Sequence, residues 1–311
     1  METSNSKGSA SHVAVVICSH NRPATLERCL IRLKQIKSPE FSVVVADSAP
    51  TSDETKLVAA GYGADYVLSP EKGASRARNV GTRATEADII AYLDDDMVPH
   101  PSWLGQLLEE FADEDTMAVT GPVLGLELAG SPDIKLRLAM ERAPWGPHRF
   151  YIDRSSPQWF ERTNFGGVGD GNFAVRRTAF DRLGGLDEQL GRGTVINSCE
   201  EHYVYFRIVE FGFKVAYAPQ AIVFHPNSSR DRGDLRNQMA EGTAYAAFVA
   251  WHHPSQSWRV GKFLAEGTFR SGRRWRTPSE CHVISLSARD KIASGLCGLS
   301  VFFRSLRQKS K

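Results

Sequence analysis

"DIIAYLDDDMVPHPSWL", residues 88–104, joins a mostly apolar run to three consecutive aspartates, and two prolines and a tryptophan follow. A continuous apolar run of this kind is typical of a buried strand in a parallel sheet. Adjacent carboxylates repel one another, so a cation or strong hydrogen-bond donors must offset their charge. We therefore expect a strand that delivers carboxylates to a polar site at its carboxyl end.

The residues before this stretch alternate between two patterns. Short runs rich in β-branched residues predict strands, and the segments between them have apolar residues at helical spacing. This alternation predicts an α/β fold in which a mostly parallel sheet is covered by helices on both faces. The expected strands are residues 13–18, 41–47, 65–69 and 88–94, and the expected helices are residues 24–36, 53–62 and 73–85.

Beyond residue 102 the pattern loosens. We expect a helix at 103–111, one strand at 117–128, and a long ordered loop at 130–165 with a single helix near 134–141. A strand, a helix and a turn follow at 171–191, then a helix ending near Gly212 and one or two further strands. The chain thus divides into a disordered N-terminus (1–11), an α/β domain (12–227) and a basic, mainly helical C-terminal extension (228–311).

The formal net charge of +2 hides an asymmetry, because residues 251–311 carry twelve Lys and Arg against three Asp and Glu. A basic tail on an acidic body suggests an anionic partner. The segment KIASGLCGLSVFFRSLRQKSK (291–311) fits either an interfacial helix on an anionic membrane or a helix packed on the α/β domain. No nucleic acid is expected as a partner, because no recognised binding motif accompanies the charge.

The cysteines and the apolar runs indicate in which cellular compartment the protein is expected. Five scattered cysteines without a C-x-x-C pair argue for reduced thiols in a cytoplasmic chain, and against a disulfide framework or a zinc site. The apolar run at 13–18 is too short for a signal peptide, and no stretch approaches the ~18 apolar residues of a spanning helix. We expect a cytoplasmic protein, with peripheral contact at the inner face of the membrane left open.

Three carboxylates are expected beyond strand ends, which is where ligands bind to open parallel sheets: Asp47, Asp94 and Asp96. In an extended chain Asp94 and Asp96 point the same way while Asp95 diverges. Hard oxygen ligands favour Mg²⁺ or Mn²⁺, and Mg²⁺ usually shares its shell with substrate phosphates. The alternative is that the aspartates cap the following helix, although Asp94 lies far upstream for that role.

Several blocks together resemble glycosyltransferase family 2. They are VVICSHNRP (15–23), VVVADSAPTSDET (43–55), GASRARNVG (73–81), IIAYLDDDMVPHPSWL (89–104), GDGNFAVRRTAFDRLGGLDEQLG (169–191) and SCEEHYVYFRIVEFGFKVAYAPQAIVFH (198–225). Each block alone is weak, but their ordered set is specific and covers about residues 13–227. The resemblance implies a GT-A type three-layer sandwich and an inverting transfer from a nucleotide-sugar donor.

The resemblance also implies donor-binding residues. The loop His20, Asn21, Arg22 would line the nucleotide pocket, and Asp47 would contact the nucleobase. Arg76 and Asn79 match a helix that faces the nucleotide, with a solvated arginine as the alternative for Arg76. In the aspartate motif, Asp94 and Asp95 compete as the ribose contact. The donor would be a UDP-, GDP- or dTDP-sugar.

Metal, base and acceptor residues follow from the same resemblance. Asp96 would hold Mn²⁺ or Mg²⁺ on the diphosphate, and His225 would complete the metal shell. Glu201 would be the catalytic base, although the family usually has Glu-Asp where this chain has Glu200-Glu201. Asp170 and Gly171 would lie near an acceptor hydroxyl, carried by a glycan, a lipid-linked molecule or a small molecule.

Two other functions remain to be weighed. A nucleotidyltransferase would need a glycine-rich, basic triphosphate loop after the first strand, and SHNRP (19–23) lacks the glycines. A non-catalytic nucleotide-sugar binder is suggested by Glu201 and Tyr203, which depart from the family pattern. Donor hydrolysis that depends on Glu201 would separate an enzyme from a binder.

Overall fold

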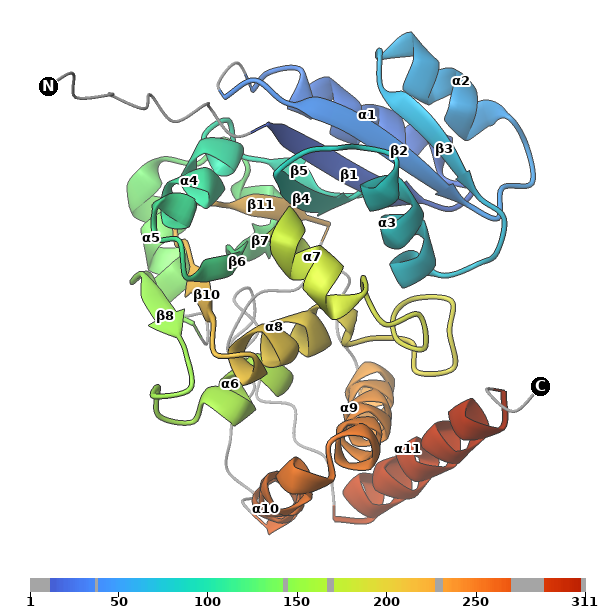
Figure 1. Ribbon diagram of the computed structural model, residues 1–311, viewed down its shortest axis with the longest axis vertical. Coiled ribbons are helices and arrows are strands. Elements are labelled where there is room, and N and C mark those ends of the chain that lie inside the picture. The colour runs from blue at the N-terminus through green and yellow to red at the C-terminus, as the bar shows by residue number, and fades with distance from the viewer. Residues whose placement is uncertain are drawn as a thin grey trace, which may run out of the picture.

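The computed structural model describes residues 12–36, 39–141, 145–166, 171–226, 232–269 and 288–308. An eight-stranded sheet forms its centre, in the order β3-β2-β1-β4-β9-β6-β10-β8 (Figure 1). The strands are β1 (Val13–Ser19), β2 (Ser42–Ser48), β3 (Asp65–Ser69), β4 (Ile89–Asp94), β6 (Thr116–Thr120), β8 (Phe150–Ile152), β9 (Asn172–Arg176) and β10 (Lys214–Tyr217).

The first four strands of the sheet are parallel, as the alternating pattern predicts. β1 pairs in parallel with both β2 and β4, and β2 pairs in parallel with β3. β9 runs antiparallel between β4 and β6, and β8 is an antiparallel edge strand beside β10. The sheet is therefore mainly parallel but mixed.

Helices cover both faces of the sheet, which confirms the predicted layered fold. Neighbouring residues of β1 enter different cores: Val15 packs with residues of α1 and α4, whereas Val16 packs with residues of α7 and α8. This division follows from the alternation of side chains along a strand. The helices of the α/β part are α1 (Pro23–Leu33), α2 (Glu54–Gly61), α3 (Ala74–Arg83), α4 (Trp103–Glu109), α5 (Asp133–Glu141), α6 (Trp159–Asn164), α7 (Arg177–Leu183) and α8 (Glu200–Glu210).

The prediction of a single strand at 117–128 is wrong, because this segment forms two strands that belong to different sheets. β6 ends at Thr120, and β7 (Val123–Gly125) joins a small second sheet with β5 (Val98–Pro99) and β11 (Val223–His225). Gly121 and Pro122 separate the two strands. A Cβ on Gly121 would lie 2.0 Å from the carbonyl oxygen of Ala221, and proline cannot donate to a ladder. The expected loop at 130–165 likewise contains β8 and α6 besides the predicted helix.

The described C-terminal residues are helical, as expected. α9 (Arg232–His252) packs along α11 (Ala288–Gln308), with α10 (Ser257–Phe269) beside α9 (Figure 1). Tyr245 and Phe248 of α9 are fully buried in the same core as α8. No helix in the described ranges combines the length and apolar character needed to cross a bilayer. Cys18, Cys29, Cys199 and Cys297 are free thiols; Cys281 and the predicted disordered residues 1–11 lie outside the described residues.

Candidate active site

The strand register gathers polar residues at one edge of the main sheet. Ser19, the last residue of β1, stands beside Asp47 of β2, and Cys18 stands beside Asp94, the last residue of β4. All three strands are parallel, so their carboxyl ends meet at this edge. Asp47, in β2, and Asp94, the last residue of β4, thus lie at the carboxyl ends of the two strands that flank β1.

Asp95 turns inward and is fully buried. The Ser19 hydroxyl donates to Asp95 Oδ2 at 2.7 Å, and Arg22 Nη2 lies 2.5 Å from Asp95 Oδ1. Burial raises the pKa of Asp95 to about 6, against the opposing effects of the Ser19 hydrogen bond and the Arg22 charge. Arg22 directly precedes Pro23, the first residue of α1, so the start of that helix fixes the arginine over the aspartates.

Asp96 joins the main sheet edge to the small sheet. Arg22 Nη1 donates to Asp96 Oδ2 at 2.9 Å, and Nε2 of His225, the last residue of β11, lies 3.5 Å from Asp96 Oδ1. Burial opposes ionisation of Asp96, but His225 and Arg22 outweigh it and lower its pKa. The hydrogen bond with Asp96 in turn raises the pKa of His225, against the effect of burial. The predicted metal pair is therefore in contact across 129 residues of chain.

Asp94 has a different cation, Arg78, which sequence reasoning missed. This buried α3 arginine donates to Asp94 Oδ1 at 2.7 Å and to Glu200 Oε1 at 2.7 Å, and its Nη2 lies 3.2 Å from Glu201 Oε1. Glu200 and Glu201 are buried in the first turn of α8. One guanidinium thus links the predicted base to the aspartate motif.

The two α3 residues that the resemblance singled out have other partners. Arg76 pairs with Glu71 and, at 3.3 Å, with Glu188. The buried Asn79 amide accepts from the Leu186 N–H at 2.8 Å and donates to the Leu186 carbonyl and Glu188 Oε1. In this structure Asn79 therefore holds the 186–188 loop against α3.

The loop after β1 and the end of β2 form the opposite side of the edge. His20 Nδ1 lies 2.5 Å from the Ser48 carbonyl oxygen, and Asn21 accepts from the Thr51 N–H and hydroxyl at 2.9 and 3.0 Å. Tyr66 donates to Asp47 Oδ2 at 3.1 Å. Burial raises the pKa of Asp47, while the Tyr66 hydrogen bond partly offsets that effect.

Of the two predicted acceptor residues, Asp170 lies outside the described residues, and Gly171 lies against the aspartate motif. Gly171 has φ +68°, and a Cβ there would meet Met97 Cε at 2.6 Å and Asp94 Oδ2 at 2.8 Å. This close approach explains why the position holds glycine.

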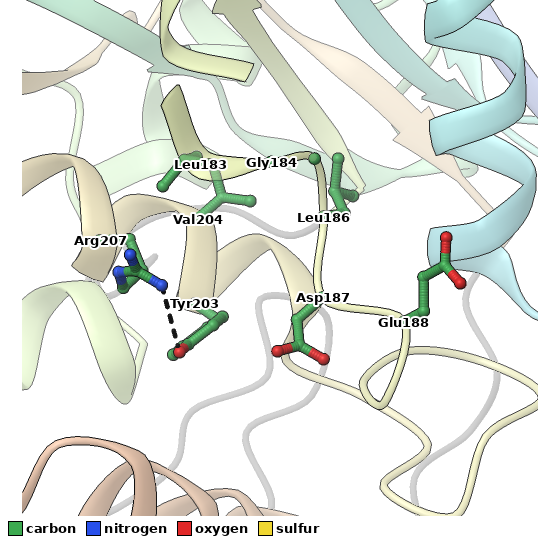
Figure 2. Close-up of a pocket in the computed structure, with 9 residues that line it drawn as sticks. Leu183, Gly184, Leu186, Asp187, Glu188, Tyr203, Val204 and Arg207 are labelled. Atoms are coloured by element: carbon green, nitrogen blue, oxygen red, sulfur yellow. Dashed lines mark hydrogen bonds between the residues drawn. The ribbon is translucent and has the colours of Figure 1, made fainter. Parts of the chain in front are cut away.

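A pocket of about 270 Å³ lies along α8, between that helix and the loop that follows α7. Figure 2 shows Tyr203 and Arg207, one turn apart on α8 and joined by a hydrogen bond, with Asp187 and Glu188 on the loop. Sequence reasoning treated this loop as a turn only. Its glycines and acidic residues (LGGLDEQ, 183–189) were the available signal.

Asp96 and His225 are the side chains at this edge that could hold a divalent ion. No group of three or more His, Cys, Asp or Glu side chains with metal-binding geometry occurs in the described part of the chain. Asp96 and His225 nevertheless offer one carboxylate and one imidazole in contact, and among the described residues the buried Asp96 Oδ1 has no hydrogen-bond partner closer than that imidazole at 3.5 Å. Two protein ligands suit Mg²⁺ or Mn²⁺ that takes further oxygens from phosphates. The residues therefore fit a metal that is shared with substrate.

A mainly parallel sheet with carboxylates gathered at its carboxyl edge is an architecture that binds ligands there, and comparison with known proteins identifies the family. Residues 14–184 match Glycosyl transferase family 2, and the chain belongs to that family. It is 28% identical over 258 residues to the pre-mycofactocin glycosyltransferase of Mycobacterium tuberculosis strain ATCC 25618 / H37Rv, covering 79% of this chain and 49% of that protein. The chain thus spans about half the length of that relative.

Another relative matches over the same share of its own length as of this chain. The glucosyl-dolichyl phosphate glucuronosyltransferase of Haloferax volcanii is 28% identical over 231 residues, which are 68% of each chain. Among solved structures, the mannosyltransferase PcManGT from Pyrobaculum calidifontis, in complex with GDP-Man and Mn²⁺, has a TM-score of 0.56 at 17% identity, covering 97% of this chain and 84% of that one. This likeness confirms the predicted GT-A fold.

Proposed function

We propose that the protein is an inverting glycosyltransferase that moves a sugar from a nucleoside-diphosphate sugar to an acceptor hydroxyl with the help of Mn²⁺ or Mg²⁺. The observation that carries this proposal is the division of one sheet edge into two poles. Asp96, His225 and Arg22 form one pole, and Glu201, held by Arg78, belongs to the other. Asp94 and its neighbours in the aspartate motif connect the two.

The donor side of the reaction uses the first pole. A bound divalent ion would be held by Asp96 and His225 and would supply charge stabilisation to the leaving diphosphate. Arg22 contributes a fixed positive charge beside it, which favours the same developing negative charge. Asp47 and the His20–Arg22 loop would receive the nucleoside, because they occupy the neighbouring strand ends. PcManGT with GDP-Man and Mn²⁺ supports a donor and ion of this kind.

The acceptor side uses Glu201. Its carboxylate takes the proton of the acceptor hydroxyl while the hydroxyl oxygen attacks the anomeric carbon. The new glycosidic bond forms as the bond to the diphosphate breaks, and the electron pair leaves with the diphosphate. Displacement in one step inverts the anomeric centre. The acceptor class remains a hydroxyl of a glycan, a lipid-linked molecule or a small molecule.

The test is a screen of UDP-, GDP- and dTDP-sugars with Mn²⁺, in which donor turnover and calorimetric binding are both measured. We expect one donor class to bind and to be turned over slowly without acceptor. EDTA and Asp96→Ala should remove turnover and weaken donor binding. Glu201→Gln should lower turnover by about 10²–10⁴-fold with donor binding retained, because the amide cannot accept the acceptor proton.

Glu210→Gln, in the last turn of the same helix, is the control, and circular dichroism verifies that each variant is folded. Donor binding with turnover that survives Glu201→Gln would refute the base assignment. Binding without turnover in the wild type, with every acceptor class tried, would favour the non-catalytic binder.

A further inference from the structure

The outer face of α11 carries a continuous apolar stripe. Ile292, Leu296, Leu299 and Phe303 follow one another at helical spacing, so they lie on one side of the helix. Their exposed fractions are 59%, 64%, 39% and 56%. Large apolar residues exposed singly are ordinary, but a row of four on one helix face indicates an interaction surface.

The opposite face of α11 already has a partner. Ser294, Phe302 and Ser305 are buried, and Gly298 lies so close to α9 that a Cβ there would come within 2.3 Å of the Ala240 carbonyl oxygen. Packing on α9, beside which α11 lies in Figure 1, therefore fixes the rotation of the helix. The outward direction of the stripe is a property of the folded protein.

Aromatic rings extend the stripe onto α9. The Phe303 ring lies 5.5 Å from the ring of Phe302, which lies 6.2 Å from the ring of Trp251. Trp251 is 60% exposed at the end of α9. Tryptophan is enriched at membrane–water interfaces, where its amphipathic ring sits at headgroup level. We define Trp251, Ile292, Leu296, Leu299 and Phe303 as the α11 surface.

The charge of α11 is almost entirely positive. It carries Arg289, Lys291, Arg304 and Arg307, and its single acidic residue, Asp290, is engaged by Arg236 of α9. Arg289 and Arg304 are exposed. An apolar stripe bordered by basic residues is complementary to a bilayer with anionic headgroups. A second copy docking through the same face would instead bring like charges together.

From these observations we infer that the α11 surface docks the protein on an anionic lipid bilayer. The helix lies in the interface, its stripe enters the headgroup–acyl boundary, and its basic residues contact anionic headgroups. The α11 surface shares no residue with the candidate active site around Asp96 and Glu201.

The experiment is co-sedimentation of the full chain with vesicles of phosphatidylcholine containing 30% phosphatidylserine, and with phosphatidylcholine alone. We expect binding to the anionic vesicles and about tenfold or more weaker binding to neutral ones, with the difference reduced in 0.5 M salt. Leu296→Ser/Phe303→Ser should lower binding to anionic vesicles by about tenfold or more, because two large side chains no longer enter the bilayer.

Helix α5 supplies matched controls, because it has exposed apolar and basic residues of its own. Ile134→Ser/Leu138→Ser and Lys135→Gln should leave vesicle binding unchanged, while Arg289→Gln/Arg304→Gln should weaken it. Undiminished binding by the folded Leu296→Ser/Phe303→Ser variant would overturn the inference. So would a wild-type dimer in light scattering that this variant makes monomeric, since the surface would then belong to a second copy.

Discussion

Replacing Arg78 by glutamine should destabilise the protein more than any other single exchange at the strand edge. The guanidinium contacts Asp94 and Glu200 at 2.7 Å and Glu201 at 3.2 Å, and it lies over the Phe173 ring at 5.8 Å. The arginine and both glutamates are buried, so water does not replace the lost cation. Removing one partner of a buried ion pair costs about 3–5 kcal/mol, and three carboxylates put Arg78 at the upper end.

Urea unfolding followed by circular dichroism in EDTA measures this loss directly. Arg76→Gln is the matched control, because Arg76 lies two residues upstream with partly exposed partners and should cost no more than about 1 kcal/mol. If Arg78→Gln does not fold, Arg78→Lys still tests the bridge, since an ammonium cannot span three carboxylates. Arg78→Gln/Glu200→Gln should recover part of the loss. A loss for Arg78→Gln equal to that for Arg76→Gln would refute the shared-cation reasoning.

Two further predictions concern the edge. Burial raises the pKa of Asp47, so the folded state binds a proton at this residue more tightly than the unfolded state does. The contribution of Asp47 to the free energy of unfolding therefore falls as pH rises from about 4 through the pKa of the folded state. Asp47→Asn should therefore gain stability relative to wild type as pH rises from 3.5 to 7 in urea titrations; a flat difference would contradict it. Gly171→Ala should lower sugar transfer by about tenfold or more, because its Cβ would collide with Met97 and Asp94. Gly130→Ala, also at positive φ but in open space, should cost about 1 kcal/mol of stability without affecting transfer, and equal rates in both variants would contradict the steric argument.

Most of the sheet is predictable from the sequence because buried parallel strands are recognisable as apolar runs. The strands at 13–18, 41–47, 65–69 and 88–94 match β1 to β4 within one residue at either end. The error at 117–128 has a local and a tertiary cause, because Gly121-Pro122 is itself a strand-breaking signal. The apolar pattern continues through Gly121 and Pro122, but contact with Ala221 redirects the chain into the second sheet. The residues of the segment itself do not indicate where Ala221 lies in the fold.

Within the candidate site, residues at strand ends are easier to predict from the sequence than residues on helices. Asp47 and His225 lie at strand ends, where the apolar pattern of the strands places them, and Asp96 lies two residues beyond the end of β4. On α3, by contrast, the arginine that contacts the aspartate motif is Arg78, two residues and about 200° of rotation from Arg76. Gly81 lies against β1, so close that a Cβ would meet Val16 Cγ1 at 2.6 Å, and this contact sets the rotation of the helix. Which face of α3 meets the sheet is decided by that packing, and helical spacing alone does not determine it.

The three aspartates illustrate the same limit and show what their clustering requires. β4 ends at Asp94 and the chain then turns, so the alternation of an extended strand no longer applies to Asp95 and Asp96. Arg78 neutralises part of a group made of Asp94, Glu200 and Glu201, while Arg22 serves Asp95 and Asp96. Five carboxylates thus share two guanidinium groups, and the raised pKa of Asp95 reflects its burial among them. Even with the His225 imidazole protonated beside Asp96, these five carboxylates outnumber the three cations, so the formal charge of the group stays negative. A divalent cation bound at Asp96 would offset this remaining charge and would at the same time attract a diphosphate, which links the electrostatics of the edge to the proposed donor.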